Sequence, residues 1–170
     1  MESATNETNE SNQMPDFEEG MLTEFFSQGG TFKELKNLSD STMESVYSAA
    51  YNLYQSGKYE EAIKVFQFLC FYDHYNAKYY VGLGACRFMQ KEYANAIEFF
   101  SFAATMNTDD PRPMLYMGDC YLAQGDDAGA KVAYEAAAEW AGDQKEIAEE
   151  KKRAKNMLSN LAVSRQAKKE

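Results

Sequence analysis

Apolar residues recur every three or four positions through most of the chain after residue 42, and this spacing predicts a succession of amphipathic helices. The stretch VYSAAYNLYQSGKYEEAIKVFQFLC, residues 46–70, contains two such helical runs separated by a short polar turn. The three prolines lie outside the long periodic runs, as helices require, because proline is excluded from their interiors. The pattern therefore predicts an all-α protein.

A repeat of 34 residues organises these helices. Small residues return at this interval, and an aromatic residue follows the second of them by four positions. The set comprises Ala50, Gly84 and Gly118, then Ala62, Ala96 and Ala130, and finally Phe66, Phe100 and Tyr134. This pattern resembles the tetratricopeptide repeat, in which small residues let two helices approach closely while an aromatic ring fills the gap beside them. We expect three repeats, residues 43–76, 77–110 and 111–144, stacked into a right-handed α-solenoid.

The segments that flank the repeats differ in composition. Residues 1–16 are polar and acidic, which predicts a disordered tail. Residues 17–42 predict a helical segment interrupted at Gly29 and Gly30. Thr31 with Glu34 reads as a capping box, and Ser41 with Glu44 is expected to open the first repeat helix in the same way.

Residues 145–170 predict a helix that caps the last repeat, since each repeat otherwise leaves an apolar face bare. One side of this helix is apolar, with Ile147, Ala154, Met157, Leu158 and Leu161. The charge run at residues 149–153 is expected to be only its solvent-exposed face.

The first helix of the first repeat carries two separate stripes. Tyr47, Tyr51 and Tyr54 centre roughly 110° away from the apolar stripe that contains Val46 and Leu53. Since the first helices of stacked hairpins line the concave side of a solenoid, we expect these tyrosines to face a peptide-binding groove. The same offsets in the next two repeats extend the lining to Lys78, Val81, Gly82, Ala85, Phe88, Arg112, Leu115, Tyr116 and Asp119.

Charge and the remaining chemistry narrow the function. The formal net charge is −10, and an acidic body argues against nucleic-acid binding because phosphates would be repelled. No window has the apolar length of a membrane span, and no signal peptide is evident, so we expect a cytoplasmic protein that does not insert into membranes. Three scattered cysteines and the single histidine, His74, form no metal or catalytic set. The sequence predicts neither an enzyme nor a cofactor.

Two runs resemble a known family more specifically. GGTFKELKNLSDSTMESVYS and QSGKYEEAIKVFQFLCFYDHYNAKYYVGLGACR, within residues 29–87, are similar to the class II chaperones of bacterial type III secretion, the low-calcium-response type. The resemblance implies a chaperone that keeps hydrophobic translocator proteins soluble by holding an extended segment in its groove. It places Tyr47, Tyr51 and Tyr54 on the family's groove aromatics, and Val81, Gly82 and Ala85 on its second-repeat pocket.

The same resemblance implies a homodimer formed through the amino-terminal helix. The residues that it places in this contact are Phe17, Met21, Leu22, Phe25 and Phe26.

Other functions remain open from the sequence. A partner of a transcription activator is one, because some members of the family take this additional role. A general peptide-binding repeat scaffold is another, and a purely structural scaffold without cargo is a third. A carboxylate clamp for acidic peptide tails is disfavoured, since Tyr51, Ala85 and Asp119 stand where that clamp needs amide or basic side chains.

Overall fold

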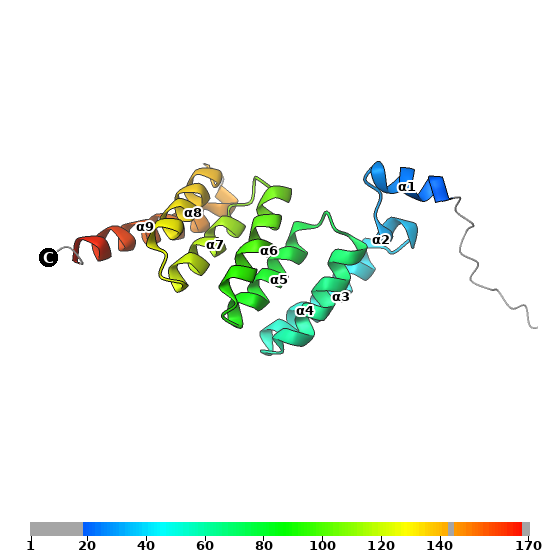
Figure 1. The fold of residues 1–170 in the computed structure, drawn as a ribbon, viewed down its shortest axis with the longest axis horizontal. Coiled ribbons are helices and arrows are strands. Elements are labelled where there is room, and N and C mark those ends of the chain that lie inside the picture. Colours follow the sequence, from blue (N-terminus) through cyan, green and yellow to red (C-terminus); the bar gives the residue numbers. More distant parts are fainter. Residues whose placement is uncertain (1–18, 143–144, 168–170) are drawn as a thin grey trace, which may run out of the picture.

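The computed structural model describes residues 19–142 and 145–167. In these residues the chain forms short amino-terminal helices, three helical hairpins and a long final helix, arranged in a row (Figure 1). The helices are α1 (Glu19–Ser27), α2 (Phe32–Leu35), α3 (Asp40–Gln55), α4 (Tyr59–Tyr72), α5 (Ala77–Met89), α6 (Tyr93–Met106), α7 (Arg112–Ala123), α8 (Asp127–Trp140) and α9 (Ala148–Ala167), with a 3₁₀ turn at Lys145–Ile147. The predicted all-α solenoid of three tetratricopeptide repeats is confirmed.

The turn inside each hairpin is closed by a residue with positive φ. Gly57 (75°), Lys91 (64°) and Gly125 (78°) occupy equivalent positions, 34 residues apart. In each turn the backbone N–H of the next residue donates to the carbonyl five positions earlier, which satisfies the end of the first helix. The second repeat accepts a lysine where glycine is the unstrained choice.

The predicted N-terminal cap is correct for α2 and wrong for α3. Thr31 and Glu34 form the predicted capping box, each side chain accepting from the other residue's backbone N–H. The prediction for Ser41 is wrong: α3 begins two residues earlier, because the Ser39 hydroxyl accepts from the backbone N–H of Thr42. About half a turn more of helix therefore precedes the tyrosine stripe.

The close approach predicted between paired helices is present. Ala50, Ala62, Ala96 and Ala130 are fully buried. A Cβ placed on Gly118 would lie 2.4 Å from the ring of Tyr134, and one on Gly84 would lie 2.6 Å from the ring of Phe100. Glycine is therefore required at both positions by aromatic rings that fill the space between the helices.

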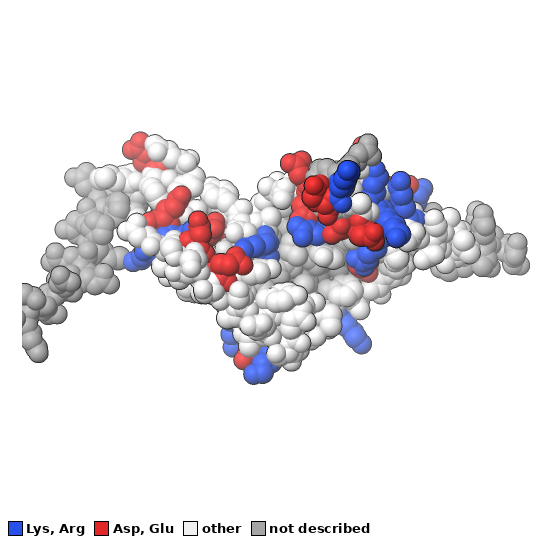
Figure 2. Space-filling model, turned by 180° about the vertical axis from the view of Figure 1, so that it is seen from behind, with Lys and Arg blue, Asp and Glu red and all other residues white. Residues whose placement is uncertain are grey.

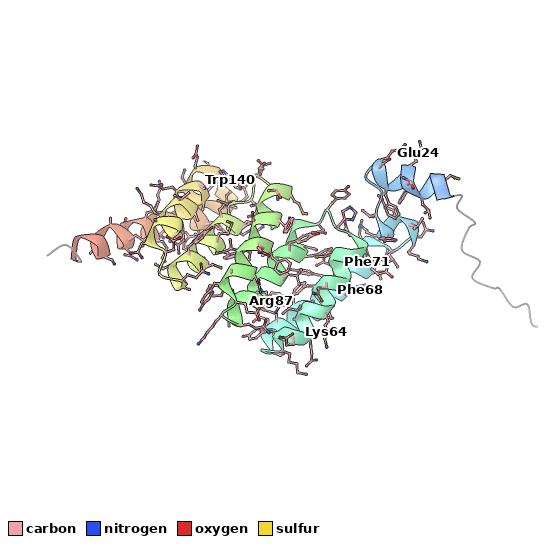
Figure 3. The ribbon with its side chains drawn as sticks, in the orientation of Figure 1. Glu24, Lys64, Phe68, Phe71, Arg87 and Trp140 are labelled. Carbon is pink, nitrogen blue, oxygen red and sulfur yellow. The ribbon has the colours of Figure 1, made fainter. Side chains whose placement is uncertain are left out.

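Both ends of the repeat array are covered. At the carboxyl end, α9 packs Ala154, Met157, Leu158 and Leu161 against α7 and α8, which confirms the predicted cap. At the amino end, the Phe32 ring of α2 stacks on Phe71 of α4 with centroids 4.7 Å apart, and Phe71 stands beside Phe68 on the outer side of α4 (Figure 3). Lys33 adds ion pairs to Asp40 at 2.5 Å and to Asp73 at 3.6 Å.

Helix α1 lies apart from the hairpins. Its Phe26 ring reaches Phe32 at 4.9 Å, while Met21 is 55 % exposed. The predicted disordered tail, residues 1–16, and Phe17 lie outside the described residues. Along the part of the chain that the structure describes, every helix is too short or too polar to cross a bilayer.

Candidate binding groove

Two adjoining cavities open on the side of the first helices, α3, α5 and α7. Their volumes are about 600 Å³ and about 540 Å³, and they share Tyr47, Val81, Arg112 and Tyr116. We call the two cavities together the groove. Of the predicted lining residues, the structure places these in the groove: Tyr47, Tyr51, Tyr54, Lys78, Val81, Gly82, Ala85, Phe88, Arg112, Tyr116 and Asp119.

Leu115 is the exception among the predicted residues. It is 2 % exposed and packs in the core with Ala130 and Tyr134, so it does not line the groove. Its counterpart one repeat earlier, Val81, does line it. The equivalence fails because α9 covers the third repeat, and Ala154 and Leu161 of this helix join the cluster that buries Leu115.

The tyrosine stripe is shared between the core and the groove. Ring centroids lie 6.5 Å apart for Tyr47 and Tyr51 and 6.3 Å apart for Tyr51 and Tyr54. Tyr47 also reaches Phe66 at 5.9 Å, whereas Tyr51 is 46 % exposed. Burial raises the pKa of the Tyr47 and Tyr54 phenols above the ordinary value, so both stay neutral hydrogen-bonding groups. The three rings thus form a continuous aromatic wall.

Gly82 lets a core ring reach the groove. A Cβ at this position would lie 2.4 Å from the ring of Phe66, so any side chain here would collide with it. Phe66, and Phe100 of the next repeat, which packs on Gly84, form part of the groove floor although both are buried core residues. From the sequence, both rings are predicted only as packing residues, and the glycine opposite Phe66 is the one signal that indicates otherwise.

The third repeat brings charged groups to the groove. Asp119 accepts from the Tyr134 hydroxyl at 2.8 Å and from the Arg153 guanidinium at 2.6 Å. Arg112 binds Asp110 through two hydrogen bonds of 2.7 Å. Arg153 comes from α9 and lines the groove, so the prediction that residues 149–153 are only a solvent-exposed face is wrong for this residue.

Lys78 of the second repeat also brings a charge to the groove, but its ion pair is made with the first repeat. Its ammonium group pairs with Glu44 of α3 and lies 4.4 Å from the centroid of the Tyr47 ring. The pair links the equivalent positions of the first two repeats, as the Asp119–Arg153 pair links the third repeat to the cap.

Reactive side chains do not gather in the described residues. Across residues 19–142 and 145–167, no three His, Cys, Asp or Glu side chains could share a metal ion. Burial raises the pKa of the Cys70 thiol to about 12 and that of Cys120 to about 12, which keeps both protonated. His74 lies against Tyr75 with ring centroids 4.1 Å apart.

Comparison with known proteins places this groove in a family. Tetratricopeptide-repeat family models match residues 43–76 and 87–159. The chain is 39 % identical over 145 residues to the low calcium response locus protein H of Yersinia pestis, covering 85 % of this chain and 86 % of that protein.

Solved structures agree. The Yersinia enterocolitica type III secretion chaperone SycD, in complex with a peptide of the translocator YopD, matches at 39 % identity and a TM-score of 0.70, covering 75 % of this chain and 98 % of that one. PcrH in complex with the chaperone binding region of PopD matches at 37 % identity and a TM-score of 0.71, covering 75 % and 96 %. SycD in an alternative dimer matches at 38 % identity and a TM-score of 0.71, covering 75 % and 97 %.

These relatives are chaperones and not enzymes, in agreement with the sequence analysis. On the strength of the sequence match, the repeats and the groove together, this chain belongs to the tetratricopeptide-repeat translocator chaperones of bacterial type III secretion.

Proposed function

We propose that this chain is a cytoplasmic chaperone that holds an extended segment of a hydrophobic translocator in its groove before secretion. The observation that carries the proposal is the continuous lining of aromatic and small residues from Tyr54 on α3, through Gly82 and Ala85 on α5, to Tyr116 on α7. SycD and PcrH, which share this fold, were solved with translocator segments.

The lining suits an extended chain with alternate side chains buried. Between Tyr51 and Phe88 the groove is lined by Ala85 and by the Phe66 ring that packs on Gly82, and an apolar cargo side chain can pack there. Each cargo side chain buried there contributes about 1.5–3 kcal/mol before the cost of ordering the peptide. Three or four such contacts contribute about 5–12 kcal/mol before that cost, which supports micromolar binding, about 8 kcal/mol, with no need for a nucleotide.

Co-production with a translocator tests the proposal. A neighbouring gene that encodes a protein with two apolar spans would supply the candidate cargo. We expect this translocator to remain in the supernatant and to co-purify when the chain is present, and to aggregate when it is absent. Failure to co-purify with any translocator of the same secretion system would contradict the proposal.

We further propose that α1 forms a homodimer contact through Met21, Leu22, Phe25 and Phe26, with Phe17 as its predicted extension. The exposed side chain of Met21 and the few contacts of α1 with the hairpins support this. Replacing Met21 and Leu22 with Asp should shift the protein from dimer to monomer in light scattering, since a charge buried at the interface is strongly unfavourable.

The matched control is Gln67→Asp on the exposed side of α4, which should leave the oligomeric state unchanged. A monomeric wild-type protein at micromolar concentration would remove the dimer proposal. A role as partner of a transcription activator stays a prediction from the sequence.

A further inference from the structure

Two arginines at the cap end of the groove stand over carboxylates that are nearly hidden. The Arg112 side chain is 53 % exposed, whereas Asp110, which binds it at 2.7 Å, is 16 % exposed. The Arg153 side chain is 46 % exposed, whereas Asp119, which binds it at 2.6 Å, is 18 % exposed. The carboxylates orient the guanidinium groups from below, so the surface offered to the groove is cationic.

Lys78 provides an internal comparison. Its side chain is 38 % exposed, but its partner Glu44 is 58 % exposed, so anion and cation are both presented and largely cancel. Only the third repeat and the cap combine an exposed cation with a recessed anion among the groove residues named above. The groove therefore differs in charge along its length.

Both guanidinium groups act on the same ring. Burial raises the pKa of the Tyr116 phenol most strongly; Arg112 and Arg153 each lower it, and the weaker effects of Asp110 and Glu150 raise it. Arg112, Tyr116 and Arg153 also line the same cavity.

Figure 2, which shows the molecule from behind, has charged side chains gathered toward the amino-terminal helices and toward α9, with a largely uncharged surface between them.

We infer that the groove selects cargo segments in which an acidic side chain flanks the apolar residues, with its carboxylate bound by Arg112 and Arg153. The inference rests on the proposed function and names the chemistry that the cargo must carry. An arginine side chain has five N–H donors in a planar fork. Asp110 accepts two hydrogen bonds from the Arg112 guanidinium, and Asp119 accepts one from that of Arg153. The remaining donors match a carboxylate in number and geometry.

The arrangement also sets the direction of the cargo. Apolar side chains fit between α3 and α5, beside Tyr51, Gly82 and Phe88, whereas the acidic side chain is held by α7 and α9. A segment placed in the reverse direction would bring its carboxylate to the aromatic end, where no cation lines the wall formed by these residues. Charge complementarity thus excludes wrong registers more than it adds affinity.

Overlapping peptides that tile the translocator, each labelled with a fluorophore, provide the test. The peptide that the wild-type protein binds most tightly is made with each acidic residue changed to Gln in turn. We expect one Glu→Gln or Asp→Gln change to weaken binding about tenfold, because a hydrogen bond to a charged group is lost. The affinity of the acidic peptide should fall as salt is raised, and that of the Gln peptide should fall much less.

The protein variants locate the effect. The double variant Arg112→Gln, Arg153→Gln should bind the acidic peptide and its Gln counterpart with affinities within twofold of each other. Neither peptide can form the carboxylate–guanidinium interaction with this variant. The matched control is Lys152→Gln on α9, whose ammonium group is exposed beside Glu149 and does not line the groove. This variant should keep the full tenfold discrimination.

The possible results distinguish failure of cargo binding from failure of the selection for acidic cargo. If the wild-type protein binds none of the translocator peptides, the proposed function fails, and this inference fails with it. If it binds, but every Gln peptide is equivalent to its acidic parent, only the selection by Arg112 and Arg153 is overturned. These wild-type measurements decide the matter even if the double variant does not fold.

Discussion

Replacing Tyr47, Tyr51 and Tyr54 together with alanine is expected to abolish co-purification of the translocator. The three rings form one wall of the groove, with neighbouring centroids 6.3–6.5 Å apart, and the change removes all of it. If each ring contributes about 1.5 kcal/mol to cargo binding, affinity falls by about three orders of magnitude. Isothermal titration with the bound peptide measures the loss directly.

The matched control is the triple Tyr→Phe variant, which keeps the rings and removes only the hydroxyl groups. It should retain cargo binding within about tenfold, because the contact is mainly apolar. The alanine variant also loses core contacts, since Tyr47 and Tyr54 pack against the cluster around Phe66. Circular dichroism must therefore show that it is folded, and a folded alanine variant that still binds cargo would refute the groove assignment.

Gly118→Val is expected to lower the free energy of unfolding by about 3 kcal/mol, the upper part of the usual range for overpacking a filled core. A Cβ on Gly118 would lie 2.4 Å from the ring of Tyr134, which is fully buried and cannot withdraw into solvent. For a chain of this size, such a loss corresponds to a fall in Tm of about 10 °C, measured by thermal unfolding.

The same substitution should also disturb the groove. The Tyr134 hydroxyl holds Asp119, and Asp119 holds Arg153. The matched control is Gly20→Val on α1, where no atom lies within 4 Å of the added Cβ. Stability of the control should change by no more than about 0.5 kcal/mol. Equal stability of the two variants would mean that helix α7 does not approach Tyr134 as closely as described.

The repeat and the aromatic wall were predictable because they follow from periodicity alone. An interval of 34 residues places Ala62, Ala96 and Ala130 at equivalent points whatever surrounds them. Helical geometry then separates Tyr47 and Tyr51 from the apolar stripe of the same helix. Phe66 shows where this reasoning stops: it is a core residue by sequence and is buried in the structure, yet its ring packs on Gly82 of the next repeat and forms part of the groove floor.

By itself, the sequence determined the fold, the hairpin contacts and most of the groove, since each of these depends on spacing within one repeat or between neighbours. Only the tertiary structure decided the fate of Leu115 and Arg153, because both depend on where the capping helix crosses the third repeat. That helix packs on Leu115 and brings Arg153 to Asp119. The sequence predicted only the carboxylate of Asp119 at this point of the groove, whereas the structure adds the guanidinium group of Arg153 there. Periodicity cannot supply this pairing, since the helix that makes it is not itself a repeat.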